Sequence, residues 1–361
     1  EVLEGLEPVR HRPGMYIGGT DNNAIHHLAV EIIDNSMDEV VAKHATVINI
    51  ELSKNNTISI SDNGRGIPID NHPKFKNKSA LEIIMTTLHS GGKFSNKNYA
   101  TSSGLHGVGA SVVNALSSFL KVQVIRKGNL YSQEFSRGLP TTKLNQIKSP
   151  KKSNGTYISF KPDPIIFGDN NLLNPDKLFK ILEYKAYLFG GVEINWKCDT
   201  SLIQENSKTP NSKKICYKNG IIDYIQLKIS TIPMFTSSTF HGKVKIKDEN
   251  VEWVIAWLSN NETSFIETFC NTVPTPLGGS HELGFRHALT KGIRNFADIK
   301  GFKKANELVY EDLIASTGSI LSIFIKDPQF QGQTKEKLVN LSSTKLVELA
   351  IKDRFETWLS N

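Results

Sequence analysis

The sequence predicts an α+β fold arranged in two domains, and three observations support this prediction. Helical and strand patterns alternate through the first half of the chain. The strand patterns come mostly in pairs joined by short polar turns, which is typical of antiparallel neighbours. A polar stretch at residues 200–214, TSLIQENSKTPNSKK, is typical of a linker or exposed loop, and the mixed pattern resumes after it. We therefore expect a first domain of mixed sheet and helices over residues 1–215 and a smaller second domain over residues 216–361.

The elements of the first domain follow from local spacing and turn residues. Residues 23–44 have the spacing of an amphipathic helix, and residues 47–64 contain two strand patterns around a Lys-Asn-Asn turn. Residues 79–89 and 108–117 have helical spacing, and the Gly-, Ser- and Asn-rich stretch between them predicts a mobile loop. A hairpin with its turn near residues 127–129 and a strand at residues 155–163 complete this domain.

The second domain has the same mixture of elements. A helix is expected near residues 220–229, followed by strands at residues 251–258 and 264–273. Residues 280–297 predict a long helix, residues 319–326 a strand, and the chain from residue 343 a closing helix. The sequence contains no internal repeat and no low-complexity tract.

Composition indicates a soluble globular protein of the cytoplasm. Hydrophobic residues make up 39% of the 361 residues and charged residues 22%. No segment has the apolar length that a bilayer crossing needs, and the N-terminus has no signal-peptide pattern, so we do not expect a membrane among the partners of this protein. Cys198, Cys216 and Cys270 are far apart, which argues against a disulfide framework and a cysteine zinc site. Because the first residue is not Met, we expect an excised fragment or a lost start.

The charge balance permits an anionic partner without requiring one. The formal net charge is +7, with 26 basic and 20 acidic residues up to residue 215, and 17 and 16 after it. A basic excess suits nucleic acid or nucleotide, but a small and dispersed excess is explained equally well by a solvated surface.

The helix at residues 23–44 carries acids without compensating bases. On a helical wheel, one side holds the apolar residues Ala29, Ile32, Ile33, Met37 and Val40. The opposite side holds the polar residues His27, Glu31, Asp34, Asn35 and Asp38. A solvated face usually interleaves Lys or Arg at a spacing of four, and this face has none.

A site that handles water or a cation explains this face better. Glu31 lies one turn after His27, which suits a general base oriented by a histidine. Asn35 lies one turn further on, and its amide oxygen suits a hard cation such as Mg²⁺. Asp34 and Asp38 are expected to make supporting hydrogen bonds.

Two glycine-containing stretches suggest where a nucleotide would bind. In SDNGRGIP (residues 61–68), Asp62 ends a strand, and Gly64 and Gly66 permit backbone turns that side chains would forbid. A carboxylate there can accept a hydrogen bond from an exocyclic amine such as that of adenine, although a plain turn also explains the pattern. In SGLHGVGASVVNALS (residues 103–117), glycines precede a helix, so backbone N–H groups can approach an anion. A flexible loop leading into a helix is the alternative.

Taken together and in this order, the motifs resemble the GHKL ATP-binding superfamily. E-x-x-x-N, D-x-G-x-G and G-x-x-G-x-G are shared by gyrase-type topoisomerases, ninety-kilodalton heat-shock chaperones, MutL and sensor histidine kinases. The longer stretches LEPVRHRPGMYIGGTD, HHLAVEIIDNSMDE, TLHSGGKFSNKNYATSSGLHGVGASVVNALS and DPQFQGQTKEKL narrow the resemblance to type IIA topoisomerase ATPase subunits. IDNSMDEVVAKHA and FCNTVPTPLGGSHELGFRHALTKG favour the topoisomerase IV branch over the gyrase branch.

The resemblance implies an ATP-binding GHKL (Bergerat) sandwich followed by a transducer domain of ribosomal-protein-like βαβ type. Glu31 would be the general base, oriented by His27, and Asn35 would ligate Mg²⁺. Asp62 would accept from adenine, with Thr156 sharing a water. The remaining ATP contacts would come from Gly64, Arg65, Gly66, Ile67 and Pro68, and from Tyr99, Gly104, Leu105, His106, Gly107, Val108 and Gly109 of a lid loop at about residues 74–109.

In the second domain, the resemblance singles out the QTK motif. Lys335 would reach the γ-phosphate of ATP, with Gln333 beside it, so that hydrolysis changes the domain arrangement. Arg65, paired with Glu39, and Arg126 would form the lip of the pocket where coumarin antibacterials bind. Double-stranded DNA would contact Arg286, Lys291 and Arg294 on a helix, followed by Lys300, Lys303 and Lys304.

The resemblance also implies partners and alternatives. A second copy of this chain and a DNA-cleaving partner (the A subunit of topoisomerase IV) are expected to complete a heterotetramer. The family's N-terminal arm and its cleavage-associated domain are expected to lie outside this chain. The gyrase B subunit, with ATP-dependent negative supercoiling, is the first alternative. A MutL-like or chaperone-like clamp is a more remote one, which RPGMYIGGTD and QTKEKL disfavour. A sensor kinase would need a histidine-bearing helix before the ATP domain, and a non-enzymatic module would bind ATP without releasing phosphate.

Overall fold

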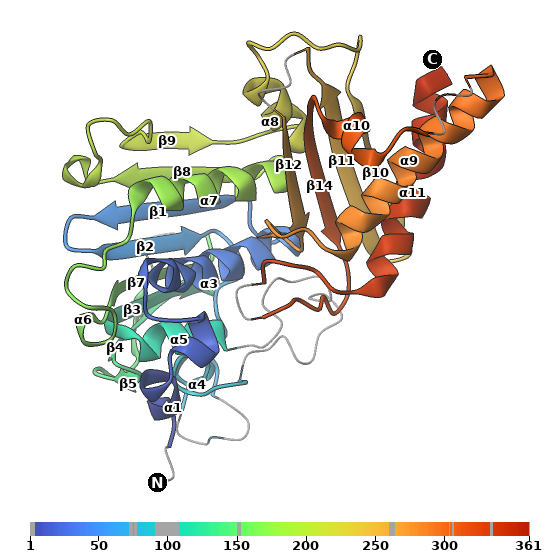
Figure 1. The fold of residues 1–361 in the computed structure, drawn as a ribbon. Helices are drawn as coiled ribbons and strands as arrows, with labels where there is room; N and C mark the ends of the chain where they lie inside the picture. The colour runs from blue at the N-terminus through green and yellow to red at the C-terminus, as the bar shows by residue number, and fades with distance from the viewer. Residues whose placement is uncertain are drawn as a thin grey trace. The chain divides into compact units, whose positions relative to one another are not determined.

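The chain forms two compact units, Glu1–Lys218 and Asn219–Asn361. This computed structural model describes residues 4–71, 75, 78–90, 108–149, 153–259, 264–302, 304, 307–332 and 335–360. The predicted α+β class is confirmed, since each unit combines one mixed sheet with helices (Figure 1). None of the described helices combines the length and the apolar composition that a membrane crossing needs.

The elements of the first unit alternate along the chain. In order, they are α1 (Glu7–His11), α2 (Gly14–Ile17), α3 (Asn22–Val41), β1 (Val47–Ser53), β2 (Thr57–Asp62), α4 (Ala80–Thr86), α5 (Gly109–Ala115), β3 (Ser117–Arg126), β4 (Asn129–Ser136), β5 (Leu139–Pro140), β6 (Asn145–Lys148), β7 (Gly155–Pro162), α6 (Pro164–Phe167), α7 (Pro175–Leu188), β8 (Glu193–Cys198), the 3₁₀ helix η3 (Thr200–Leu202) and β9 (Ser212–Ile215).

The described strands of this unit form one sheet in the order β5-β4-β3-β7-β2-β1-β8-β9, with β6 also paired to β4. Neighbours are antiparallel except β1 and β8, which run parallel. The two predicted hairpin turns are confirmed: Asn56 ends the first, and Lys127 and Gly128 form the second, all with positive φ. Residues 200–214, interpreted as a linker or exposed loop, are not a linker, because η3 and the edge strand β9 lie there. Residues 203–211 between these two elements have no helix or strand and are exposed or half-buried, which agrees with the loop alternative.

Helices α3, α5 and α7 lie over one face of this sheet (Figure 1). The N-cap of α3 is Asp21, whose side chain accepts from the Ala24 amide at 2.9 Å. The N-cap of α7 is Asn174, whose side chain accepts from Asp176 and Lys177 ahead of an apolar face. These caps set where both helices begin, and so they fix which side chains meet the sheet.

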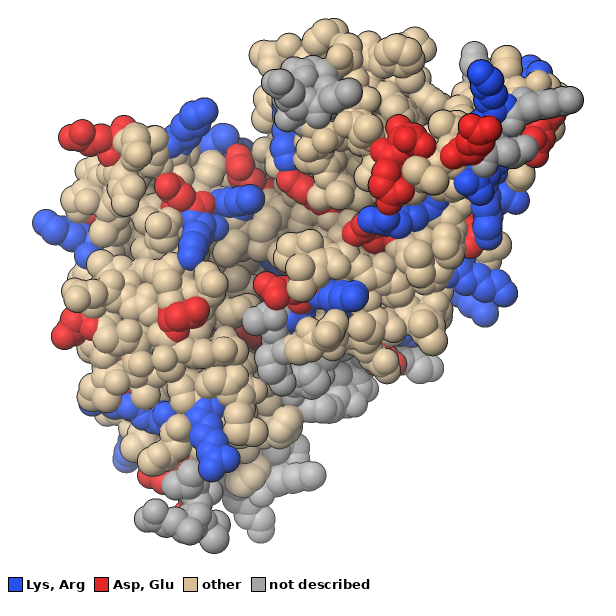
Figure 2. All heavy atoms as spheres, viewed as in Figure 1, with Lys and Arg blue, Asp and Glu red and all other residues tan. Residues whose placement is uncertain are grey.

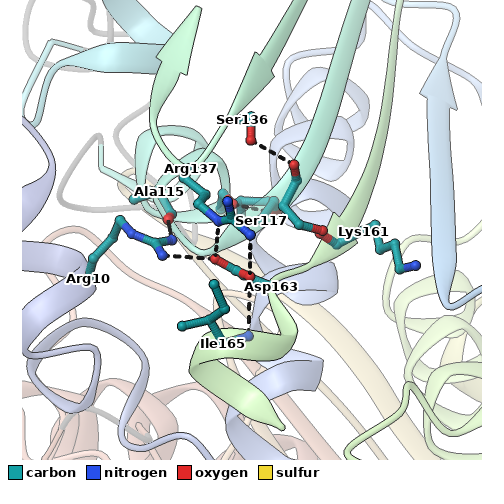
Figure 3. Close-up of polar contacts among 10 residues, drawn as sticks. Arg10, Ala115, Ser117, Ser136, Arg137, Lys161, Asp163 and Ile165 are labelled. Carbon is teal, nitrogen blue, oxygen red and sulfur yellow. Dashed lines mark hydrogen bonds and ion pairs between the residues drawn. The ribbon is translucent and has the colours of Figure 1, made fainter. Parts of the chain in front are cut away.

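A buried carboxylate ties the N-terminal helix to the sheet (Figure 3). Asp163 is fully buried and accepts from Arg10 at 2.8 Å and from Arg137 at 2.9 Å. Arg10 also donates to the carbonyl of Ala115 at 2.7 Å, at the last residue of α5. The cluster therefore joins α1, α5 and the segments after β4 and β7, and it orients α5, whose first residue is Gly109.

The second unit has a smaller sheet and two long helices. Its elements are α8 (Ile221–Lys228), β10 (Phe240–Ile246), β11 (Glu249–Trp257), β12 (Phe265–Cys270), β13 (Val273–Pro274), α9 (Ser280–Lys300), α10 (Tyr310–Ile314), β14 (Thr317–Phe324) and α11 (Leu341–Ser360). The described strands follow the order β10-β11-β14-β12-β13. β12 and β14 are parallel and are connected through α9 and α10, which is the predicted βαβ arrangement.

The core of this unit lies between the sheet and the paired helices α9 and α11 (Figure 1). Glycines let these helices approach closely, because a Cβ on Gly284 would collide with the backbone of Thr344. Phe355 and Trp358 of α11 pack against Trp257 of β11 with nearly parallel rings. This packing holds the C-terminal half of α11 against the sheet.

Candidate functional site

Helix α3 presents a narrow polar stripe at intervals of one turn. His27, Glu31, Asn35 and Glu39 are each half-buried along it. Asp34 and Asp38, which we expected on the same polar face, are instead 8% and 3% exposed. The predicted stripe is thus corrected: it runs toward Glu39, and the other two carboxylates lie on the packed side of the helix.

Asp34 lies in the interior because a lysine from another helix meets it. Lys185 of α7 is 1% exposed, and its Nζ lies 2.7 Å from Oδ1 of Asp34. Oδ1 accepts no well-aligned hydrogen bond among the described residues, so the attraction is chiefly electrostatic. The pair offsets one negative charge of α3 and fixes the rotation of the helix, which determines where Glu31 and Asn35 point.

Glu31 lies directly against the start of α5. A Cβ added to Gly109 would meet the carboxylate end of the Glu31 side chain, so any larger residue at this position would displace that carboxylate. Val108 is the N-cap of α5 and makes no side-chain cap hydrogen bond. The end of the predicted glycine loop therefore reaches the carboxylate that we expect to act as the base.

Asp62, at the end of β2, is held by α3 and by its own glycine turn. Its carboxylate accepts from the Ser36 hydroxyl at 3.0 Å and from the Gly64 amide at 2.9 Å. Burial raises the pKa of Asp62 to about 6, helped by the nearby charge of Glu39 and opposed by these hydrogen bonds. The carboxylate is costly to keep ionised, and a donor supplied by a ligand would relieve that cost.

The turn after Asp62 is packed too closely for side chains at either glycine. A Cβ on Gly64 would lie 2.8 Å from Asp62 Oδ1, and Gly66 has φ +79° with Val124 and Ile125 beside it. Arg65 donates to both carboxylate oxygens of Glu39, at 2.7 and 3.1 Å. The predicted Arg65–Glu39 pair is confirmed, and it fastens the turn to the last turns of α3.

Residues of β3 and β7 line the other side of this turn. Thr156 is the cross-strand neighbour of Asp62, and its hydroxyl accepts from the Ile67 amide at 3.3 Å. Arg126 donates to the carbonyl of Gly66 at 2.8 Å. Ile67 is half-buried and Pro68 is exposed. The predicted adenine-side residues thus form one connected group around Asp62.

Several predicted contacts fall outside the described residues. Tyr99, Gly104, Leu105, His106 and Gly107 lie in the undescribed stretch 91–107, and Gln333 lies at 333–334. Lys303 is also outside the description. Their predicted roles stay predictions.

Lys335 belongs to the second unit and has φ +57°, a left-handed backbone conformation that is uncommon for a non-glycine residue. It follows the undescribed residues 333–334 in the loop between β14 and α11.

The three cations predicted to contact DNA already have partners within the unit. Arg286 pairs with Glu282 and Glu311 and lies over the ring of Tyr310, with its guanidinium carbon 4.4 Å from the centroid. Lys291 pairs with Glu348, and Arg294 donates to the carbonyl of Leu308. On the face drawn in Figure 2, the described basic and acidic side chains are interspersed.

The stretch of α3 can contribute only part of a metal site. The described residues contain no group of three or more His, Cys, Asp and Glu placed to hold an ion. Asn35 supplies one amide oxygen beside Glu31. That set fits Mg²⁺, which keeps several waters and takes further oxygens from nucleotide phosphates.

Two residues of this region were missed by sequence reasoning. Ser36 lies on the packed side of α3, and no motif distinguished it from a core residue. Lys185 did leave a signal, because it continues the apolar spacing of Leu178 and Leu182 on α7. A lysine in a core position predicts a buried acidic partner, but not which one.

Comparisons with known proteins agree with this arrangement. The family described as histidine kinase-, DNA gyrase B- and HSP90-like ATPase matches residues 20–164, and DNA gyrase B matches residues 220–361. The B subunit of DNA topoisomerase 4 from Rickettsia bellii is 51% identical over the whole chain, and that from Caulobacter vibrioides is 48% identical. The chain spans 54% and 52% of these two relatives, about half of their length.

Solved structures give the same result for the fold. The topoisomerase IV ATP-binding domain of Francisella tularensis, in complex with a small-molecule inhibitor, is 36% identical with a TM-score of 0.78, covering 99% of this chain and 93% of its own. The 43K ATPase domain of Thermus thermophilus gyrase B, in complex with an aminocoumarin, is 32% identical with a TM-score of 0.78, covering 98% and 90%. The chain therefore belongs to the family of type IIA topoisomerase ATPase subunits, which includes the B subunits of topoisomerase IV and of gyrase.

Proposed function

We propose that this chain binds and hydrolyses ATP within the B subunit of a type IIA topoisomerase. The observation that carries the proposal is the stripe on α3, where His27, Glu31 and Asn35 succeed one another at one-turn intervals. The same helix holds Asp62 through Ser36 and the glycine turn through Glu39. One rigid element thus presents a base, an oxygen ligand and the support of a nucleobase acceptor.

Hydrolysis at this site needs positioning more than covalent catalysis. Glu31, oriented by His27, takes a proton from water as the water oxygen bonds to the γ-phosphorus and the bond to the leaving ADP oxygen breaks. Asp62 accepts from the adenine amino group, with Thr156 joining through a water. The wall of the nucleotide pocket is formed by the turn after β2, at Gly64, Arg65, Gly66, Ile67 and Pro68. Arg65 and Arg126 form the lip of the pocket, where a coumarin would compete with ATP.

Asn35 holds Mg²⁺ in this proposal, because it offers an amide oxygen one turn from Glu31. When bound, Mg²⁺ neutralises charge that develops on the phosphates. In this proposal the phosphates would be bound by backbone groups of the glycine loop, at Gly104, Leu105, His106, Gly107, Val108 and Gly109. The adenine or ribose edge would be contacted by Tyr99. Lys335 and Gln333 bind the γ-phosphate and distinguish ATP from ADP.

For the whole protein, we propose an ATP-operated gate for double-stranded DNA. Two copies of the chain close on ATP binding, and the DNA-cleaving partner completes the enzyme, which acts on the chromosome in the cytoplasm. The identities near 50% to the B subunits of topoisomerase 4 favour decatenation and relaxation over negative supercoiling. Because Arg286, Lys291 and Arg294 are already bonded within the unit, their contact with the phosphates of passing DNA would be weak and transient.

Substitution of Glu31 tests the hydrolytic proposal. Glu31→Gln keeps the shape of the side chain and removes its basicity, so we expect ATP turnover to fall by at least about a hundredfold while ADP affinity is retained. Phosphate release and calorimetric ADP binding measure the two effects. Glu205→Gln, at an exposed position of the same unit, is the matched control. Parental turnover by Glu31→Gln would show that Glu31 is not the base.

The branch of the family is tested on the full-length protein together with its DNA-cleaving partner. We expect ATP-dependent decatenation of linked circles without negative supercoiling of relaxed circles. Negative supercoiling would assign the protein to the gyrase branch instead, and it would leave the assignment of Glu31 untouched.

A further inference from the structure

The chain just after Lys335 is paired with the loop that leads into α9. The Leu338 amide donates to the carbonyl of Gly278 at 3.1 Å, and the Leu338 carbonyl accepts from the Ser280 amide at 3.0 Å. The Leu277 amide donates to the carbonyl of Glu336 at 3.0 Å. Residues 277–280, which we call the support segment, therefore form a short parallel ladder with residues 336–338.

Residues 336–338 are also paired on their other side. The Gln331 amide donates to the carbonyl of Lys337, and the Val339 amide donates to the carbonyl of Gln329, both at 2.9 Å. Leu338 is 1% exposed. Residues 329–331 and 337–339, which flank the QTK motif, are thus antiparallel partners, and the support segment lies along residues 336–338 on their other side.

This arrangement requires a glycine at position 279. Gly279 has φ +138°, and a Cβ there would lie 2.7 Å from the Leu338 nitrogen and even closer to its carbonyl oxygen. Any side chain would push Leu338 away or break the ladder. Lys335, three residues before Leu338, keeps its left-handed backbone only while its surroundings hold it.

The support segment is itself fixed to the core. The Thr275 hydroxyl lies 2.9 Å from Nε2 of the fully buried His281 and donates to the carbonyl of Thr268 at 2.9 Å. Thr268 belongs to β12, so the segment is attached to the sheet before it and to α9 after it. A rigid support of this kind transmits its position to residues 336–338.

We infer that Gly279 is a positioning residue for Lys335. By leaving room for Leu338, it lets the support segment set the backbone from which Lys335 extends toward a γ-phosphate. The inference rests on the proposed γ-phosphate contact of Lys335 and adds to it the element that preorganises the lysine.

The test compares nucleotide preference in Gly→Ala variants of the full-length protein. We expect Gly279→Ala to lower affinity for a non-hydrolysable ATP analogue roughly tenfold, as for a lost charge-assisted hydrogen bond, and ADP affinity less than about twofold. Gly301→Ala is the matched control, because Gly301 also has positive φ but nothing lies within 4 Å of its Cβ position. A merely structural role would lower both affinities or neither.

Two further variants make every outcome decisive. If Gly279→Ala does not fold, Gly278→Ala decides, since its Cβ meets chiefly the movable side chain of Glu282, and we expect a smaller loss of the same preference. Lys335→Ala reports on the γ-phosphate contact alone. Loss of preference in Lys335→Ala, with full preference in both glycine variants, overturns the inference and leaves the proposed function standing. Full preference in Lys335→Ala overturns the proposed contact itself.

Discussion

Asp62, which is half-buried, and Asp163, which is fully buried, are two carboxylates of the same unit, and their surroundings shift their pKa values in opposite directions. Asp163 accepts from two guanidinium groups and from the Ile165 amide. Burial by itself raises the pKa of Asp163, but the hydrogen bonds from Arg137 and Arg10 outweigh it, and the pKa lies below its ordinary value. Asp62 accepts from a hydroxyl and an amide, with no cation bonded to it among the described contacts, and its pKa is raised to about 6.

The difference separates a structural carboxylate from a binding one. At Asp163 two arginines of the protein neutralise the charge, so the interaction stabilises the folded state. The donors that the protein supplies to Asp62 are neutral: the Ser36 hydroxyl and the backbone amides of Gly64 and Thr156. The charge of Asp62 therefore remains costly, and a ligand that donates a hydrogen bond to it gains binding free energy. Asp163 is fully buried and Asp62 is half-buried, yet the pKa of Asp163 is the one that is lowered, so the charge of the partners decides the direction of the shift.

The largest effect is expected at Asp163. Asp163→Ala removes the buried common acceptor of Arg10 and Arg137, whose own side chains are 20% and 45% exposed. It also leaves the Ile165 amide without its carboxylate partner. Because hydrogen bonds to charged groups contribute about 1.5–3 kcal/mol each and solvent takes over part of the loss at the two arginines, we expect a loss of about 3 kcal/mol. Chemical denaturation measures the loss. Asp169→Ala, at an exposed aspartate on the same connection, should stay within about 0.5 kcal/mol. Equal stability of the two variants would mean that the cluster in Figure 3 contributes nothing to folding.

A smaller and different effect is expected at Asp62. In Asp62→Asn the amide oxygen can still accept from Gly64, so folding is retained. The amide nitrogen is a donor, however, and would oppose the adenine amino group. ADP affinity should therefore fall by about 1–3 kcal/mol, or roughly ten- to a hundredfold, as measured by calorimetry. If stability fell and affinity did not, Asp62 would be a structural carboxylate like Asp163.

The sequence predicted what local spacing decides. The stripe from His27 to Asn35 follows from one-turn intervals, and the hairpins follow from Lys-Asn-Asn and Lys-Gly-Asn. Asp62 was found because a carboxylate at a strand end before two glycines has a local reason to be there. These inferences needed no knowledge of distant parts of the chain.

Contacts between distant residues were not predictable in this way. Arg10 and Asp163 are 153 residues apart, and the sequence around either residue contains no pattern that identifies the other as its partner. Asp34 was placed with the polar stripe because a helical wheel of α3 does not include residues of other helices. Its partner, Lys185, belongs to α7. Strand β9 was included in a predicted linker or exposed loop because an edge strand tolerates the polar residues that are also typical of loops.

The smallest expected effect is a pH dependence that distinguishes the two carboxylates. Because the folded-state pKa of Asp62 is raised, the folded protein binds a proton that the unfolded chain has lost. Its contribution to stability is therefore present below about pH 4 and is lost as the pH rises toward about 6. The pKa shift of Asp62 corresponds to at most about 3 kcal/mol of folding free energy, and the partial exposure of the Asp62 side chain reduces this to about 1 kcal/mol.

Asp163 contributes with the opposite sign, since its pKa is lowered: its stabilisation is present at neutral pH and is lost as acid protonates it. Stability of the parent and of Asp62→Asn, measured between pH 4 and 7, separates the two contributions. The difference in stability between the variant and the parent should grow by about 1 kcal/mol in favour of the variant as the pH rises through this window. A constant difference would mean that Asp62 titrates as it does in the unfolded chain. ADP should reduce the parent's loss, because ionised Asp62 then accepts the adenine hydrogen bond whose absence makes its charge costly.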